Sequence, residues 1–444
     1  MSRIRRLCIF LLPFLISLAA CDYVATIVEP ATPSPEATII QPTLAPVVTI
    51  PGVVEQTPVP QVTELRVWIP PEIGALTETG TQTLNSQLRE FEAAHSNLSI
   101  LIEQKPVEGP GGIISYLRTG RGVAPSVLPD LIALPTSTLS EPVVQDLVYP
   151  LGELIDLEEI AAVYPAPATG IIRDERLFGF PFATSGLTHL AYDPSVVTET
   201  VPLTWPRFIS DTTHTLVLPA DSREGAIFGL QFYLAEGGAL VNDAGQPNLE
   251  VEPLTQALDQ IRLNKANLLQ SHQMKTLDEA WQYYQLGLSD FVWTRTDFFL
   301  NQRGQSPGGN NAQSTRNQGF LPVPGPTGPL APLVNSWAWT VSTPDAARQV
   351  LATELIQWLV LPDNMAEWSR QSHILPSTRE AMGILAEQDP YFLFAGREME
   401  RADATPISQS SQVLDVIGEA VFQALTTDTP SGELAETAAS ALRQ

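Results

Sequence analysis

Residues 129–135 read Pro-Asp-Leu-Ile-Ala-Leu-Pro, a short apolar run with a turn signal at its end. A run of this length between prolines predicts a buried strand. Further out along the chain, residues 65–69 and 98–102 predict two more strands, and the apolar spacing in residues 84–94 predicts a helix between them. Strands that alternate with helices form α/β sheets with parallel strands, and such sheets place ligands at the carboxyl ends of their strands.

The N-terminus has the pattern of a secretory signal peptide. Arg3, Arg5 and Arg6 form a basic head, an apolar run covers residues 7–18, and Leu-Ala-Ala precedes Cys21. This junction resembles the bacterial lipobox, in which the cysteine is lipidated and becomes the new N-terminus. The alternative is a membrane-spanning helix, but the apolar run is shorter than the ~18–20 residues that a bilayer crossing needs. We therefore expect residues 1–20 to be a lipoprotein signal peptide, and Cys21 to carry the lipid that anchors the protein on the extracytoplasmic face of a cell membrane.

The composition narrows the class of protein further. The chain has 444 residues, 44% of them apolar, which is enough for two good-sized cores. Its formal net charge of −25 argues against nucleic acid and against docking onto anionic lipid through the body of the protein. Cys8 and Cys21 are the only cysteines. Once Cys8 is removed with the signal peptide and Cys21 is lipidated, no intramolecular disulfide or cysteine metal site can form.

Residues 21–63 are rich in proline and threonine, and we expect them to form an extended, disordered tether. The alternative is an N-terminal strand docked on the body. In the second half of the chain, residues 304–319 are polar and predict a mobile loop, and a helix is expected between Thr343 as its cap and Pro362 as its end. Helical apolar spacing also occurs at residues 226–235, 254–269, 277–286, 411–425 and 432–443.

Several short motifs occur in an order that resembles one family. The strongest is Leu-Phe-Gly-Phe-Pro-Phe at 177–182, which continues to Leu-Ala-Tyr-Asp at 190–193. The other pieces lie at residues 65–68, 87–95, 129–130, 203–208, 237–240 and 337–342. From about residue 63 to the C-terminus, this order is similar to that of extracellular solute-binding proteins of bacterial ABC transporters, in the sugar-type cluster related to maltose-binding protein.

The resemblance implies a fold and a function. The expected fold is α/β, a two-lobed periplasmic-binding-protein fold of type II, in which each lobe is a mostly parallel sheet flanked by helices and a hinge joins the lobes. Residues 64–178 and 323–361 would form lobe 1, and residues 179–322 and 362–444 would form lobe 2. A monomer would capture a small solute, with a carbohydrate favoured, between the lobes and deliver it to the transmembrane subunits of an ABC permease. No cofactor and no covalent chemistry are implied.

Sugar sites need flat apolar faces for pyranose rings and planar polar groups for hydroxyls. For the aromatic candidates, packing in a core is the open alternative, and for the charged pair it is an ion pair at the surface. Candidate ligand-binding residues, carried over from the family pattern, are Trp68, Thr184, Ser185, Tyr192, Trp293, Arg295, Asp297, Asn335, Ser336 and Trp337. Because Arg295 suits an acidic compound as well as a sugar, the solute stays open.

Three other functions remain as alternatives, one of them a surface interaction protein that has lost ligand binding. The chain has no GxSxG, HExxH, GxGxxG or phosphate-loop motif, and its five histidines lack metal-ligand spacing. A secreted glycoside hydrolase with two unmarked carboxylates is therefore the weaker alternative. A solute sensor for a membrane receptor kinase would have the same fold and a different partner.

Overall fold

The computed structural model describes residues 62–443, with gaps at 153–154, 156, 211–213, 243–245, 264, 269–270, 305–317 and 406–411. The expected signal peptide, the lipidation site at Cys21, the tether up to residue 61 and most of the 304–319 segment lie outside the described residues. Within the described part of the chain, no helix has the length and apolar character that a membrane crossing requires.

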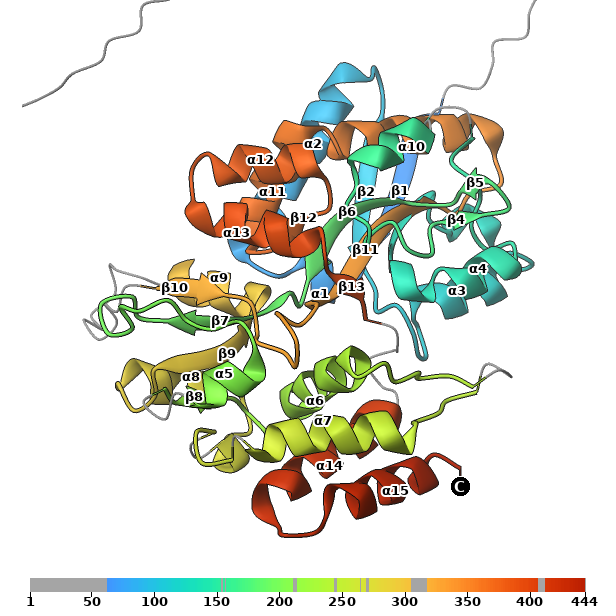
Figure 1. The fold of residues 1–444 in the computed structure, drawn as a ribbon. Coiled ribbons are helices and arrows are strands. Elements are labelled where there is room, and N and C mark those ends of the chain that lie inside the picture. The colour runs from blue at the N-terminus through green and yellow to red at the C-terminus, as the bar shows by residue number, and fades with distance from the viewer. Residues whose placement is uncertain are drawn as a thin grey trace, which may run out of the picture. The chain divides into compact units, whose positions relative to one another are not determined.

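The first sheet contains the strand predicted at residues 129–134 (Figure 1). That strand is confirmed as β3 (Leu131–Pro135), whose first four residues are completely buried. The strand order is β12-β6-β11-β3-β1-β2, with β13 paired to β11. The other strands are β1 (Glu64–Ile69), β2 (Ser99–Gln104), β6 (Phe180–Ser185), β11 (Leu333–Val341), β12 (Leu375–Pro376) and β13 (Asp403–Ala404). A separate small hairpin pairs β4 (Ile172–Arg173) with β5 (Arg176–Leu177).

Helices of the first core begin at recognisable caps. Helix α2 (Glu78–Ala94) begins after Thr77, whose hydroxyl accepts a hydrogen bond from the backbone N–H of Gly80 at 2.8 Å. The helix expected after Thr343 is α10 (Ala346–Leu359), but its cap is Asp345, which accepts from the backbone N–H of Arg348. The remaining helices of this part are α1 (Pro71–Gly74), α3 (Ile113–Gly120), α4 (Ser140–Val144), α11 (Pro362–Ser372), α12 (Arg379–Ala386) and α13 (Pro390–Met399). Short 3₁₀ turns are η1 (Pro125–Val127), η2 (Thr136–Thr138), η4 (Leu157–Ala162) and η5 (Ser271–Gln273).

The second sheet has the order β10-β7-β9-β8 and supports a second hydrophobic core. Its strands are β7 (Thr188–Tyr192), β8 (Leu216–Val217), β9 (Phe291–Arg295) and β10 (Gly319–Leu321). The helices around this sheet are α5 (Trp205–Ser210), α6 (Arg223–Ala235), α7 (Val251–Leu263), α8 (Leu277–Gln285), α9 (Thr296–Gly304), α14 (Gln412–Thr426) and α15 (Ser431–Ala441). The buried Trp281 and Tyr284 of α8 and Phe299 of α9 belong to the first hydrophobic cluster. Helices α6, α7, α14 and α15 pack as a bundle, in which α6 contacts α7 and α14, and α15 contacts the same two helices (Figure 1).

Both sheets are mixed and not mostly parallel, which corrects our expectation. In the first sheet β11 is antiparallel to both β3 and β6, and in the second sheet β7 is antiparallel to both β9 and β10. The reason lies in the chain path. The chain leaves the first sheet along β6, passes directly into β7, and returns from β10 into β11, so outgoing and returning strands run in opposite directions.

Residues 362–444, which we had placed in the second lobe, contact both sheets. β12 pairs with β6, and Trp368 of α11 lies 5.4 Å from Phe182 of β6. Tyr391 of α13 packs instead against Phe299 and Phe320 of the second sheet and its helix α9. Pro362 begins α11, as proline does at a first helical turn. Within this segment, only α14 and α15 contribute to the second core.

Candidate functional site

Four predicted residues lie side by side where the chain crosses between the sheets. Ser185 pairs with Asn335 and Thr184 pairs with Ser336 on the adjacent strands β6 and β11. The hydroxyl of Thr184 lies 3.2 Å from that of Ser336 and 3.1 Å from that of Ser377. Thr184 is completely buried and Ser336 nearly so, and their hydroxyls therefore hold the strands together. Ser185 and Asn335 are half-buried and remain accessible from outside.

Asp297 connects this crossing to the second sheet. Gly186, with φ at +81°, donates its backbone N–H to Asp297 Oδ1 at 3.1 Å. The other oxygen of Asp297 accepts a hydrogen bond from Arg295 Nη2 at 3.2 Å. Arg295 Nη1 in turn lies 3.2 Å from Glu224 Oε1. A continuous polar chain therefore runs from the crossing backbone through Arg295 to Glu224.

Glu224 and Arg295 lie close together because of the order of strands and helices. Strands β8 and β9 are parallel, α6 follows β8, and α9 follows β9. Both turns therefore lie at the carboxyl ends of a parallel strand pair, the position where open α/β sheets bind ligands. Ser222 begins α6 by accepting the backbone N–H of Glu224 at 3.1 Å, which places the acidic residue in the first helical turn.

Five charged residues meet at this position, and we refer to them as the charge cluster: Arg223, Glu224, Arg295, Asp297 and Asp415. The side chains of Glu224 and Arg295 are 14% and 22% exposed, so their charges are shielded only partly by solvent. Burial raises the pKa of Glu224, and the positive charge of Arg295 opposes that rise. Burial lowers the pKa of Arg223, and the negative charges of Glu224 and Asp415 oppose that fall. Among the described residues, neither Glu224 Oε2 nor Arg295 Nε has a hydrogen-bond partner.

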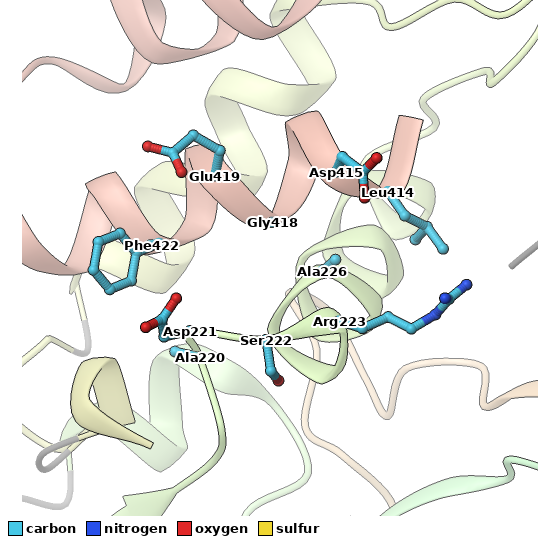
Figure 2. Close-up of a pocket in the computed structure, with 10 residues that line it drawn as sticks. All are labelled: Ala220, Asp221, Ser222, Arg223, Ala226, Leu414, Asp415, Gly418, Glu419 and Phe422. Atoms are coloured by element: carbon cyan, nitrogen blue, oxygen red, sulfur yellow. The ribbon is translucent and has the colours of Figure 1, made fainter. Parts of the chain in front are cut away.

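A groove of about 280 Å³ adjoins the charge cluster. It lies between the first turn of α6 and the stretch of α14 from Leu414 to Phe422. Arg223 and Asp415 lie towards one end of this α6–α14 groove, and Asp221 and Phe422 lie towards the other (Figure 2). Its volume is close to the lower end of the ~300–1,000 Å³ range of small-molecule sites. The remaining lining residues are Ala220, Ser222, Ala226, Leu414, Gly418 and Glu419.

A second groove, of about 310 Å³, lies at the carboxyl ends of β2 and β3 in the first sheet. Ser115 on α3 and Thr138 on η2 line it, together with Arg118 and Glu141, whose side chains form an exposed ion pair at 2.7 Å. Each sheet thus has a polar groove at the strand ends where a ligand is expected. In the residues that the structure describes, no group of three or more histidine, cysteine or acidic side chains could hold a metal ion.

The profile of the family described as "Bacterial extracellular solute-binding protein" matches residues 87–389, about two thirds of the chain. The chain belongs to this family. Membership establishes a binding protein of extracytoplasmic location and not an enzyme. No curated protein matches the chain in sequence.

Solved structures show the same two-lobed fold at low sequence identity. A cyclo/maltodextrin-binding protein complexed with maltotetraose has a TM-score of 0.67 at 16% identity, over 86% of this chain and 97% of the other. The cyclic alpha-maltosyl-1,6-maltose binding protein from Arthrobacter globiformis has a TM-score of 0.65 at 17% identity, over 86% and 98% of the two chains. The sugar-binding protein MalE from Xanthomonas citri has a TM-score of 0.66 at 16% identity, over 86% and 98%.

Two tryptophans predicted to face the solute of this solute-binding protein are packed inside it. Trp293 is completely buried in the second core, so its ring has no open face for a sugar. Trp68 is 3% exposed, with the ring of Tyr116 at 5.6 Å and Lys105 Nζ at 4.7 Å from its ring centroid. For both residues the structure favours core packing, the alternative that the sequence left open. Strand periodicity did not indicate which face of β1 and β9 each ring would occupy.

Tyr192 and Trp337 remain candidates because both are partly exposed. Tyr192 lies at the end of β7, with its ring 5.7 Å from that of Phe291. Trp337 on β11 pairs with Pro135, the last residue of β3, and therefore lies at the same strand end as the second groove.

Sequence reasoning missed Arg223, Glu224, Asp415 and Phe422. The available signal was local: Ser222-Arg223-Glu224 follows a short apolar segment and starts a helical pattern, the arrangement of a strand-to-helix turn in an α/β sheet. No local signal marks Asp415 or Phe422, which reach the groove only because α14 packs against α6.

Proposed function

We propose that this protein is a lipid-anchored solute-binding component of an ABC importer that captures a carbohydrate and delivers it to the permease. The observation that carries the proposal is the charge cluster with its adjoining groove, at the carboxyl ends of β8 and β9 and linked by hydrogen bonds to the crossing backbone at Gly186. Guanidinium and carboxylate groups bind sugar hydroxyls in a plane, and Phe422 offers an apolar face in the same groove.

Relatives of the same fold support the choice of solute. The structures compared above are of proteins that bind maltodextrins or other sugars. In the proposed mechanism, the α6–α14 groove and the groove at β2 and β3 hold opposite ends of one solute. A ligand that touches both sheets stabilises the closed arrangement by its additional contacts, and the permease then recognises that arrangement.

The proposal is tested by a thermal-shift and calorimetry screen of the purified protein against maltose, maltotriose, maltotetraose and other mono- and oligosaccharides. Binding to the native state alone stabilises by about 2.7 kcal/mol at a hundredfold excess over Kd. We expect Arg223→Gln to weaken that response. Arg370→Gln, which removes an exposed guanidinium paired with Glu367 on α11, serves as the matched control. No stabilisation by any sugar would refute the carbohydrate assignment.

The lipid anchor has an independent test. We expect Cys21→Ser to leave unprocessed precursor without diacylglycerol, which mass spectrometry of the membrane and soluble fractions detects. Unchanged processing and membrane retention of the variant would contradict the anchor and leave solute binding unaffected.

A further inference from the structure

The two ion pairs of Arg295 bear on which sugars the site can bind. Its two terminal nitrogens are each occupied by a carboxylate, Glu224 Oε1 on Nη1 and Asp297 Oδ2 on Nη2, both at 3.2 Å. A guanidinium held between two carboxylates carries no surplus positive charge for a ligand. Arg295 is therefore not the free anion receptor that its position in the sequence suggests.

The other members of the charge cluster make its net charge negative. Arg223, the second cation, is acted on by the charges of both Glu224 and Asp415. The cluster thus contains three carboxylates and two guanidinium groups, and the adjoining groove adds Asp221 and Glu419. A third cation, Lys275, lies outside the groove lining and 3.5 Å from Asp221.

We infer that this site selects uncharged or amino-substituted sugars and excludes acidic ones such as uronates. Asp221, Asp415 and Glu419 line the groove, and Glu224 and Asp297, which adjoin it without lining it, add to the exclusion through their charges. The inference rests on the proposed function and narrows it to a class of solute. A carboxylate on the ligand would lie next to protein groups with a net negative charge. Because solvent shields these charges only partly, like charges repel there more strongly than in water.

Hydrogen-bond chemistry points the same way. Asp221, Asp415 and Glu419 line the groove, and a carboxylate accepts hydrogen bonds but does not donate them. A sugar hydroxyl or ammonium group can donate to carboxylates at this site, whereas a ligand carboxylate can only accept. The geometry therefore favours donors on the ligand.

The test compares matched neutral and acidic probes on the full-length mature protein by calorimetry at pH 8, because the raised pKa of Glu224 makes an alkaline buffer suitable. The probes are glucose with glucuronate, galactobiose with digalacturonate, and maltotriose. The measured quantity is the ratio of acidic to neutral affinity within each protein. Since this ratio compares two ligands on one sample, a partly unfolded fraction does not change it.

For the unmodified protein we expect the neutral member of a pair to bind at least about tenfold more tightly than the acidic member. Glu224→Gln and Asp297→Asn each remove one negative charge with little change of shape, and we expect each to raise the ratio by about 10- to 100-fold. Glu367→Gln removes the same charge at an exposed position on α11 and should leave the ratio unchanged.

The outcomes separate the two proposals. Acidic probes that bind the unmodified protein as tightly as neutral ones overturn the inference and leave the carbohydrate function standing. A ratio that rises equally in Glu367→Gln assigns the discrimination to overall charge and also overturns it. Absence of binding by every probe removes the proposed function, and the inference with it.

Discussion

Replacement of Gly229 by alanine should destabilise the protein, although the same change inside a helix ordinarily stabilises. Gly229 lies within α6, where it packs against α14. A methyl group at this position would lie 2.3 Å from Val421 Cγ2 and 3.1 Å from Ile417 Cγ2. Carbon atoms prefer separations of about 3.5–4.0 Å, so the two helices would have to move apart or the side chains would have to turn.

The magnitude follows from two opposing terms. Valine and isoleucine have one strongly preferred rotamer in a helix, so the contact is relieved mainly by helix displacement. Overpacking of this kind costs about 1–3 kcal/mol, and the better helix propensity of alanine returns about 1 kcal/mol. We therefore expect Gly229→Ala to lower the free energy of unfolding by about 1 kcal/mol.

Gly383 provides the matched control. It lies within α12, and an added methyl group would have no atom within 4 Å. We expect Gly383→Ala to raise the free energy of unfolding by about 0.5–1 kcal/mol. Urea unfolding monitored by circular dichroism gives both values under the same conditions. If Gly229→Ala proved as stable as Gly383→Ala, the close approach of α6 and α14 would be refuted.

Three further predictions concern buried polar groups. His189 is completely buried, and burial lowers its pKa to about 3, so the unfolded state binds a proton below pH ~6.5 that the native state excludes. The free energy of unfolding should therefore fall by about 1.4 kcal/mol per pH unit as the pH drops from about 6 to 3. In urea unfolding, His189→Asn should remove that contribution to the pH dependence. Trp205→Phe should cost about 2–3 kcal/mol by thermal unfolding, because it leaves a cavity and deprives the Gln260 carbonyl of a 2.8 Å hydrogen bond. Asp130→Asn should cost about 1–2 kcal/mol in the same assay, because the buried Asp130 Oδ2 accepts from Arg348 Nη1 at 2.9 Å, although Arg348 is 30% exposed.

The elements that sequence predicted well are those with a strong local pattern. β3 is buried, and its continuous apolar run indicated that directly. Helices α6, α8, α14 and α15 appear close to their predicted spans for the same reason. The cap of α10 was wrong by two residues, because Thr343 and Asp345 can both cap a helix and only the backbone geometry decides between them.

The properties that the sequence left open depend on distant residues. Trp293 was a ligand candidate with core packing as its alternative, and which face of β9 it occupies depends on the second core. The assignment of α11–α13 to the second lobe stays a prediction, and the pairing of β12 with β6 has no local signal in that segment. Arg295 and Asp297 were found from their position, whereas the partner that neutralises Arg295 lies on another helix and was missed.

The charge cluster stabilises the crossing between the sheets in addition to its proposed binding role. Replacement of some of its residues therefore has a structural effect as well as an effect on binding. Asp297 holds the crossing backbone at Gly186 with one oxygen and Arg295 with the other, so the side chain that shapes the site also fixes the chain between the two sheets. A solute that draws Arg295 or Glu224 towards itself would therefore act on the crossing through Asp297. In a two-state protein such a differential contact is what couples ligand binding to a change of arrangement. In the described part of the chain, Glu224 has no contact of this kind with the crossing backbone. We therefore expect its replacement to alter ligand preference alone, whereas replacement of Asp297 should also change the response of the lobes.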